Sequence, residues 1–489
     1  RTLQVTGSGV TTFGGIVGGT AELASLTVDG GGTTLLNAGT VTTAGAQSYT
    51  DAVTLGADTT LVTTNSSVGF TSTLNSLASL SAPATLSITA GTGNITLGGI
   101  VGGATGGALG AVTLVSATNV GINAAFTAAS LTQQAGAGSG TTIIGGATTL
   151  TGALGFAGGN LVINAAVGAG GAVSFTGSAL TVNAAVTAGG AVTVANTGTF
   201  TTSATGDINA TGAFTQSGAG SNSLAGDVSL TLGSAALSFA TGVTLTGNVV
   251  FSTTNGAATF AEVVDGTADN DQNLTLNAGT GVVTFAKALG AVKKLGDVVA
   301  NSTGATKFQG AVLAKSLTTN AGGSTELSAD VTTTAAQSFG DSVTLLNAVQ
   351  LTTSNAAVSI GGTLNGTHDF TATAGSANVT LTGAIGGTTR LGALKLVSTG
   401  TMTFGSSVKA ASVLTNTNGL VRLGGDVDTT TTQTYNDAIV LTANVVISGT
   451  DIALTRTVNS DGTARTLQVT GSGVTTFGGI VGGTAELAS

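Results

Sequence analysis

Cysteine and tryptophan are absent from this chain of 489 residues, and proline, histidine and methionine occur once each, at Pro83, His368 and Met402. The absence of cysteine excludes disulfide bonds and thiolate metal sites. With a single histidine, no pair of histidines can form a metal or catalytic site within this sequence. One proline in so long a chain is typical of strands bonded on both sides, because proline removes a hydrogen-bond donor from a sheet.

Charged residues are also scarce. They make up 7% of the chain, against about 25% in an average soluble domain, and none occurs from Thr59 to Gly206. No basic residue lies between Arg1 and Lys287, and the net charge is −9. These values argue against a nucleic-acid partner, whose phosphates require clusters of lysine and arginine. Disorder is disfavoured as well, because 41% of the residues are hydrophobic and the mean hydropathy is +0.46.

Long hydrophobic runs are missing too. A membrane-spanning helix needs about 20 nearly uninterrupted apolar residues. In this chain Thr, Ser, Asn or Gly interrupts each apolar run within a few positions. We therefore expect a protein that does not span a membrane. No targeting segment is visible in the sequence, which starts at Arg1.

The most informative feature that is present is a long repeat. Residues 1–25 (RTLQVTGSGVTTFGGIVGGTAELAS) reappear letter for letter as residues 465–489. We interpret the chain as one period of a tandem array, residues 1–464, followed by the beginning of the next period, residues 465–489.

A shorter repeat lies inside this period. The motif around Leu55 (QSYTDAVTLGADTTLVTTN) returns around Leu245, Leu345 and Leu441, with a fainter copy around Leu150. The successive intervals are 95, 95, 100 and 96 residues, and 78 residues close the period. They fit five, five, five, five and four units of a common length, which predicts about 24 coils of ~19 residues per 464-residue period.

Unit length and local composition favour a β-solenoid. About 19 residues is too short for the helix-pair repeats, which need 33 or more. Apolar and polar residues alternate in pieces such as Val53–Leu55 and Leu86–Ile88, and glycine-rich corners such as Ala90–Gly93 follow them. No stretch carries a sustained helical stripe with caps. We predict an all-β fold, one continuous parallel β-helix over residues 1–489, whose coils share a core with their neighbours.

Four carboxylates cluster at Glu262, Asp265, Asp269 and Asp271, the one place where acids are dense enough to bind a hard cation such as calcium. The cluster falls in the longest block, which predicts a lengthened corner. The corresponding segment 459–463 of another block has the composition of an Asx-type turn. Turn formation is the preferred interpretation, and calcium binding by Asp265, Asp269 and Asp271 is the alternative.

Other candidate residues have simpler interpretations. Asp51, Asp341 and Asp437 recur directly before a Val-Thr-Leu-like strand, which predicts turn residues. His368 is expected in an exposed loop. The lysines from Lys287 to Lys315 form a mild basic patch, interpreted as solvated corners.

No set of residues suits catalysis. The pairs Gly14–Gly15 and Gly102–Gly103 lack the Lys-Ser/Thr and the strand-to-helix context of a phosphate loop. A polysaccharide-cleaving β-helix enzyme needs acids and bases in a groove, and residues 2–286 contain no base. Sugar-binding platforms are aromatic, whereas this chain offers Tyr49, Tyr435 and phenylalanines, most of which should face the core. We expect a non-enzymatic protein with no catalytic, cofactor-binding or metal-binding residues.

The Val-Thr-Leu-type strands, Gly-Thr-Gly corners and short coils resemble the filamentous-haemagglutinin-like exoproteins of bacteria. These are giant β-helical repeat adhesins exported by two-partner secretion or as autotransporters. The resemblance covers essentially the whole chain, but the family's N-terminal secretion domain with its Asn-Pro motifs is missing, since Pro83 follows Ala82. The resemblance implies a right-handed parallel β-helix that is secreted or lies on the cell surface.

The expected function is an extracellular fibre or adhesin shaft, with periods stacked end to end. Lateral bundling is compatible with so little charge. The alternative is a passive repetitive surface that binds a host cell, a polysaccharide or ice. Such a surface should carry Thr-x-Thr on successive coils, yet Thr149–Thr151 and Thr244–Thr246 are separated by a whole block. Only Thr380–Thr382 and Thr401–Thr403 approach coil spacing.

Overall fold

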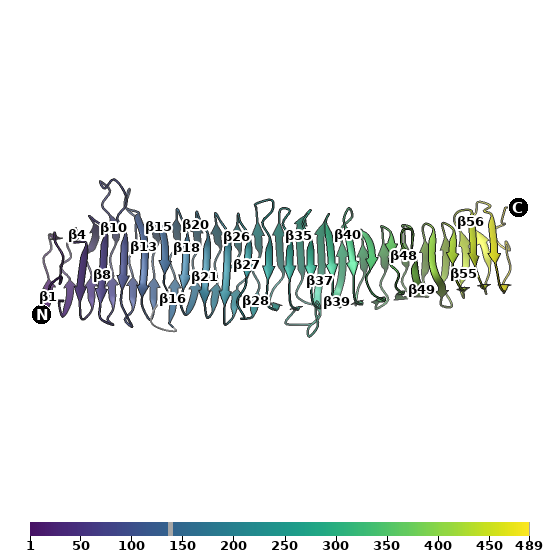
Figure 1. Cartoon of the computed structure of the whole chain (residues 1–489), viewed down its shortest axis with the longest axis horizontal. Helices are drawn as coiled ribbons and strands as arrows, with labels where there is room; N and C mark the ends of the chain where they lie inside the picture. Colours follow the sequence, from purple (N-terminus) through teal and green to yellow (C-terminus); the bar gives the residue numbers. More distant parts are fainter. Residues whose placement is uncertain (135–139, 489) are drawn as a thin grey trace. The chain divides into compact units, whose positions relative to one another are not determined.

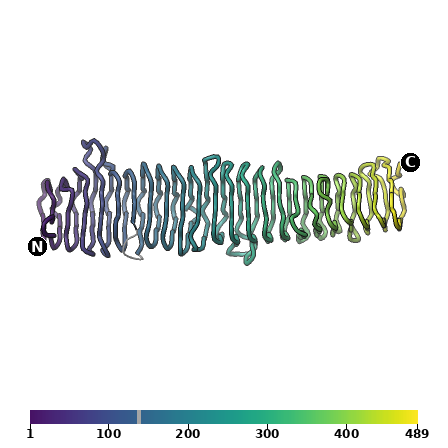
Figure 2. The backbone as a smooth tube through the Cα atoms, in the orientation of Figure 1, coloured from purple at the N-terminus to yellow at the C-terminus, as the bar shows by residue number. Residues whose placement is uncertain are grey.

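The computed structural model describes residues 1–134 and 140–488, and it divides into two compact units, Arg1–Thr241 and Gly242–Ser489. Both units are parallel β-solenoids (Figure 1), and together they comprise about 22 turns of roughly 21 residues. Figure 2 shows the backbone winding through successive turns in each unit. The described residues contain no helix. The predicted all-β parallel solenoid is confirmed, whereas the predicted number of 24 coils was too high and the predicted coil too short.

Each turn of the N-terminal unit contributes a short segment to each of three parallel sheets, whose strands stack in register. The first turns illustrate the pairing: β1 (Thr2–Val5) pairs with β3 (Ser25–Val28), β2 (Val10–Phe13) with β4 (Thr33–Leu36), and Val17 with β5 (Thr40–Thr43). The next turns add β6 (Gln47–Tyr49), β7 (Ala52–Leu55) and β8 (Thr59–Thr63) to these three sheets.

Period-two alternation in the sequence explains which side of each strand faces the core. In β3 and β7, Leu26, Val28, Val53 and Leu55 are fully buried, while the threonine between each pair is half-exposed. β-Branched and leucine side chains suit such a half-buried pleated surface. The core of each unit therefore lies between its three sheets and continues from turn to turn, as the sequence predicts.

Corner length varies between turns, which explains the error in the predicted turn count. The turn that runs from Val68 to its partner Ile95 is longer than the turn from Leu161 to its partner Leu180. The longer turn includes the segment 77–85 between β10 (Leu74–Ser76) and β11 (Leu86–Thr89). Pro83 lies in this corner, where no strand needs its missing N–H. Because extra residues enter at corners, the number of turns cannot be obtained by dividing the period by one unit length.

In the C-terminal unit, equivalent motifs of successive blocks lie in different sheets. One sheet contains, in stacking order, β42 (Gln337–Phe339), β45 (Val358–Ile360), β48 (Val379–Leu381), β50 (Thr401–Phe404), β52 (Leu420–Leu423), β55 (Ala438–Leu441) and β58 (Val458–Ser460). A second sheet contains β51 (Val408–Thr415), β54 (Gln433–Tyr435), β57 (Ile452–Leu454) and β60 (Thr475–Phe477).

The strands β42 and β54 carry the same motif in successive blocks, yet they belong to these two different sheets. In the first sheet, β55 is the fifth strand after β42, so five complete turns lead from β42 to β55. The chain passes through β54, in the second sheet, directly before it reaches β55. The block therefore ends one sheet short of five complete turns, and the prediction of a whole number of coils per block was wrong. Phe285 and Leu381, at equivalent positions of successive blocks, both face the core, but they too lie in different sheets.

Candidate functional sites

The acidic segment forms the lengthened corner that the sequence predicts, between β34 (Val264–Asp265) and β35 (Leu274–Gly279). Its carboxylates accept separate hydrogen bonds: Asp265 Oδ1 from the Val292 N–H (2.9 Å), Asp269 Oδ1 from the Lys294 N–H (3.0 Å) and Asp271 Oδ2 from Gln272 Nε2 (2.8 Å). Glu262 is exposed. Across residues 1–134 and 140–488, no group of three or more His, Cys, Asp or Glu side chains is placed to hold a metal ion. The geometry is that of a hydrogen-bonded corner.

The recurring aspartates lie in corners, as predicted, but they are buried. At most 3% of Asp51, Asp341 or Asp437 is exposed. Asp341 Oδ1 accepts the backbone N–H of Gly323, and Asp437 Oδ1 accepts that of Gly419, each over 2.7 Å and from the preceding turn. Burial raises the pKa of Asp341, and the Gly323 N–H opposes this shift by stabilising the charged form. Each aspartate therefore joins two successive turns.

A buried glutamine precedes Asp437 on the same turn and points into the core. Gln433 Nε2 donates to the carbonyl oxygens of Val427 (3.2 Å) and Ser448 (2.7 Å), and Tyr435 OH donates to Gln433 Oε1 (2.9 Å). Burial raises the pKa of Tyr435, which keeps the phenol neutral and able to donate. Tyr435 is therefore a core residue rather than a platform for sugars.

The copy of this arrangement at Gln337 lacks one hydrogen bond. Gln337 Nε2 donates to Val331 O (3.1 Å) and Thr352 O (2.9 Å), as in the other block. Phe339 occupies the position of Tyr435, and Gln337 Oε1 has no hydrogen-bond partner. The sequence shows that Phe339 replaces a tyrosine, but it does not show that Gln337 Oε1 loses a hydrogen bond. That loss follows only because both side chains, two residues apart, point into the core.

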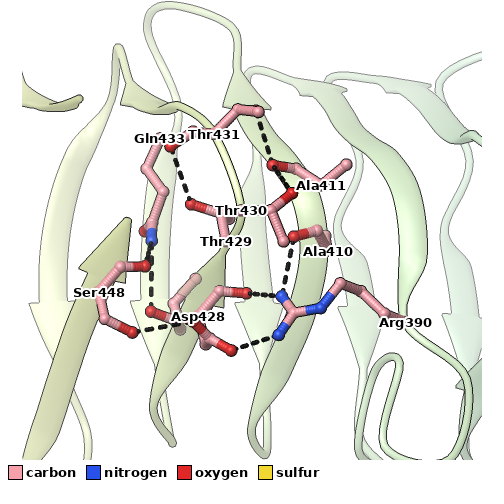
Figure 3. A network of polar contacts seen from close by, with 10 residues as sticks. Arg390, Ala410, Ala411, Asp428, Thr429, Thr430, Thr431, Gln433 and Ser448 are labelled. Atoms are coloured by element: carbon pink, nitrogen blue, oxygen red, sulfur yellow. Dashed lines mark hydrogen bonds and ion pairs between the residues drawn. The ribbon is translucent and has the colours of Figure 1, made fainter. Parts of the chain in front are cut away.

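Arg390 joins three successive turns in a polar network on the C-terminal unit (Figure 3). Its Nη1 donates to the carbonyl oxygens of Ala410 (3.1 Å) and Asp428 (2.8 Å), and its Nη2 pairs with Asp428 Oδ2. Ser448 Oγ donates to Asp428 Oδ1 over 3.1 Å. The hydrogen bond from Arg390 is the main cause that lowers the pKa of Asp428. Sequence reasoning missed this site because residues so far apart in the chain show no pairing signal.

Three lysines of the predicted basic patch, Lys293, Lys307 and Lys315, form ion pairs with acids. Lys307 Nζ lies 3.2 Å from Glu326 Oε2, and Lys315 Nζ lies 3.1 Å from Asp297 Oδ2. A hydrogen bond from Ser316 and the neighbouring Lys315 lower the pKa of Asp297. His368 is half-buried, so the prediction of an exposed loop residue was only partly correct. Within residues 1–134 and 140–488, none of these side chains shares a pocket with a second group that could act with it in catalysis.

A column of outward-facing threonine and serine side chains, interrupted once by Gly155, runs along one sheet of the N-terminal unit. Each member pairs with the next on the following turn: Thr40, Thr60, Ser87, Thr113, Thr132, Gly155, Ser174, Thr193, Thr215 and Ser238. All are at least partly exposed. The search for Thr-x-Thr at constant spacing missed this column because turn length varies. The column stands alone, because threonine and serine recur less regularly at the neighbouring outward positions of these strands.

Neither a family model, nor a curated protein, nor a solved structure matches this chain. Among the described residues, no helix has the length and hydropathy to cross a membrane. The fold therefore defines the chain as a β-solenoid protein without assigning it to a family.

Proposed function

We propose that the chain forms an extracellular structural fibre or adhesin shaft, in which tandem periods stack end to end. The single observation that carries this proposal is the repeated segment, residues 1–25 and 465–489, seen in two different settings. In residues 1–25, β1 and β2 are covered by the following turn, with Leu3 on Leu26 and Phe13 on Leu36. In residues 465–489, the same sequence packs on the preceding turn, with Leu454 paired with Phe477. The two copies of this sequence thus show one turn paired with the turn that follows it and one turn paired with the turn that precedes it.

The surfaces left open at these two places are apolar. Phe477 is 48% exposed beside a pocket of about 620 Å³ lined by Leu467, Val469, Val481 and Leu487. In the other unit Val10 and Ile16 are 73% and 66% exposed. A further turn with the sequence of residues 26–49 would cover Phe477 as Leu36 covers Phe13. Unpaired strand edges of this kind favour association with another strand.

Two further observations support a shaft. Because successive blocks of the C-terminal unit place equivalent elements in different sheets, irregular corners in that unit do not accumulate on one side. The resemblance to filamentous-haemagglutinin-like exoproteins supports secretion to the cell surface and a right-handed coil. The scarcity of nucleophile, base and metal-ligand combinations in the sequence supports a non-enzymatic role.

The test is the assembly state of the chain and of two variants. We expect concentration-dependent open filaments in sedimentation velocity and electron microscopy, and their loss in Phe477→Asp, because a charge cannot be buried between stacked turns. Ile143→Asp is the matched control, since Ile143 is 41% exposed but lies on a sheet surface. A monomer at every concentration, or a closed dimer, would contradict the proposal.

The second candidate is a passive surface that binds a periodic solid, and the hydroxyl column of the N-terminal unit favours it. Strand spacing places its members about 4.8 Å apart. Inhibition of ice recrystallisation by the chain, lost on replacing Thr132 and Thr193 by lysine, would support this candidate. The surface-binding candidate would be excluded if the chain neither affected ice growth nor bound to cellulose.

A further inference from the structure

A polar pocket lies at one corner of the C-terminal unit, where three successive turns lead into β52, β55 and β58. Its volume is about 460 Å³, and its lining includes Asn418, Asn436, Asp437, Arg456 and Thr457. Each turn contributes at least one polar side chain. With turns about 4.8 Å apart, these groups extend over roughly 10 Å along the solenoid.

Several of the lining groups have unused hydrogen-bonding capacity. Asp437 is 1% exposed: its Oδ1 accepts the Gly419 N–H, and its Oδ2 is buried out of reach of a ligand. Asn436 Nδ2 donates to Thr415 O over 2.9 Å, which orients the side chain and leaves its amide oxygen with no hydrogen bond in the described structure. Arg456 is exposed and makes no ion pair there. The corner therefore offers a ligand the Asn436 amide oxygen as an acceptor and the Arg456 guanidinium as a donor.

The equivalent corner one block earlier shows that these side chains are not needed for the fold. There Asp341 accepts the N–H of Gly323 just as Asp437 accepts that of Gly419. The positions of Asn418, Asn436 and Arg456 are occupied by glycine, at Gly322, Gly340 and Gly362. The buried aspartate alone thus maintains the corner, and the two amides and the guanidinium are additions specific to one block.

We propose that this pocket binds a neutral polyhydroxylated ligand, a sugar residue of a polysaccharide. One carboxylate and one guanidinium leave the lining without net charge, and mixed donors and acceptors match the hydroxyl groups of a sugar. A cation would meet only one carboxylate and the positive Arg456, and an anion would meet the buried Asp437. A length of about 10 Å, set by the spacing of the turns, accommodates one or two sugar residues.

Binding is expected to be weak, because no aromatic ring lines the pocket and only hydrogen bonds hold the ligand. A few net hydrogen bonds correspond to a dissociation constant on the order of 1 mM. Repetition of the pocket in tandem periods would raise the avidity for a polysaccharide. The site itself does not depend on fibre formation.

The experiment uses the whole chain and saturation-transfer difference NMR with the methyl glycosides of glucose, galactose, mannose and N-acetylglucosamine. We expect transfer to at least one of them, and its loss in the triple variant N418G/N436G/R456G, which copies the corner around Asp341. Arg456→Gly alone should weaken binding several-fold. The control N347G/K395G, with two exposed polar residues replaced elsewhere, should bind like the parent chain.

Circular dichroism separates loss of the site from loss of the fold, and all variants should retain the β-sheet spectrum of the parent chain. The proposal is overturned if no glycoside binds, if the triple variant binds as well as the parent, or if only calcium or inorganic phosphate shows a response that depends on Asp437. Filament formation is scored separately on the same samples, so failure of the fibre proposal would be recognised independently.

Discussion

Buried polar side chains in this protein bond to the backbone of neighbouring turns, and their effect on stability depends on single atoms. Gln433 has all of its amide atoms engaged, whereas Gln337 Oε1 has no partner because Phe339 replaces a tyrosine. A buried acceptor without a partner costs about 1–3 kcal/mol. The chain thus contains both states of the same arrangement, which allows a matched comparison.

Phe339→Tyr should stabilise the C-terminal unit by about 1 kcal/mol, because the new hydroxyl can donate to Gln337 Oε1. Tyr435→Phe should have the opposite sign and a similar size. Thermal and urea unfolding of both variants measure the difference. Destabilisation by both substitutions would show that ring packing, rather than the hydrogen bond, decides the outcome.

Arg390→Ala should destabilise the folded chain by about 1 kcal/mol at pH 7, since the hydrogen bonds are charge-assisted but the pair is partly exposed. Arg390 lowers the pKa of Asp428 in the folded state. The stabilisation is therefore complete above the unfolded pKa of about 3.9 and is lost as the pH falls through the lower folded value. Urea unfolding from pH 7 to pH 3 measures this dependence. A difference between parent and variant that does not shrink in acid would contradict this assignment.

Within the strands, aromatic side chains at equivalent positions stack between turns. The rings of Phe260, Phe285 and Phe308 follow one another with centroid distances of 5.2 and 5.5 Å. All three are almost completely buried. Such a stack links three turns through a single column of the core.

Phe285→Ala should cost about 3–5 kcal/mol, because it leaves a cavity between two rings. Phe285→Leu retains most of the buried apolar volume and should cost much less. Chemical denaturation of the two variants gives the comparison. Equal costs would indicate that the loss of volume does not decide the stability of this column.

Strands were the part of the fold that the sequence predicted best, because period-two alternation and glycine corners are local signals. The turn count and the sheet of each strand could not be predicted, since both depend on corner insertions such as residues 77–85. The corner roles of Asp265, Asp269 and Asp341 followed from turn chemistry. The burial of Asp341, the contact of Arg390 with Asp428 and the hydroxyl column depend on which turns stack, and no single segment contains that information.

For the whole chain, stability should not depend on divalent metal ions. The carboxylates of the acidic corner accept hydrogen bonds from backbone N–H groups and Gln272. Unfolding followed by circular dichroism should therefore give the same midpoint with excess EDTA as with excess calcium. A marked rise with calcium that disappears in Asp265→Asn would revive the calcium alternative.

Fibre diffraction from aligned filaments of the chain tests most directly whether the protein is a parallel solenoid whose tandem periods stack end to end. Such filaments should give a meridional reflection near 4.8 Å, because strands run across the axis at about that spacing. Their axial repeat should be roughly 105 Å, from about 22 turns at that spacing. An axial repeat unrelated to this length, or the absence of a meridional reflection at about 4.8 Å, would contradict this arrangement.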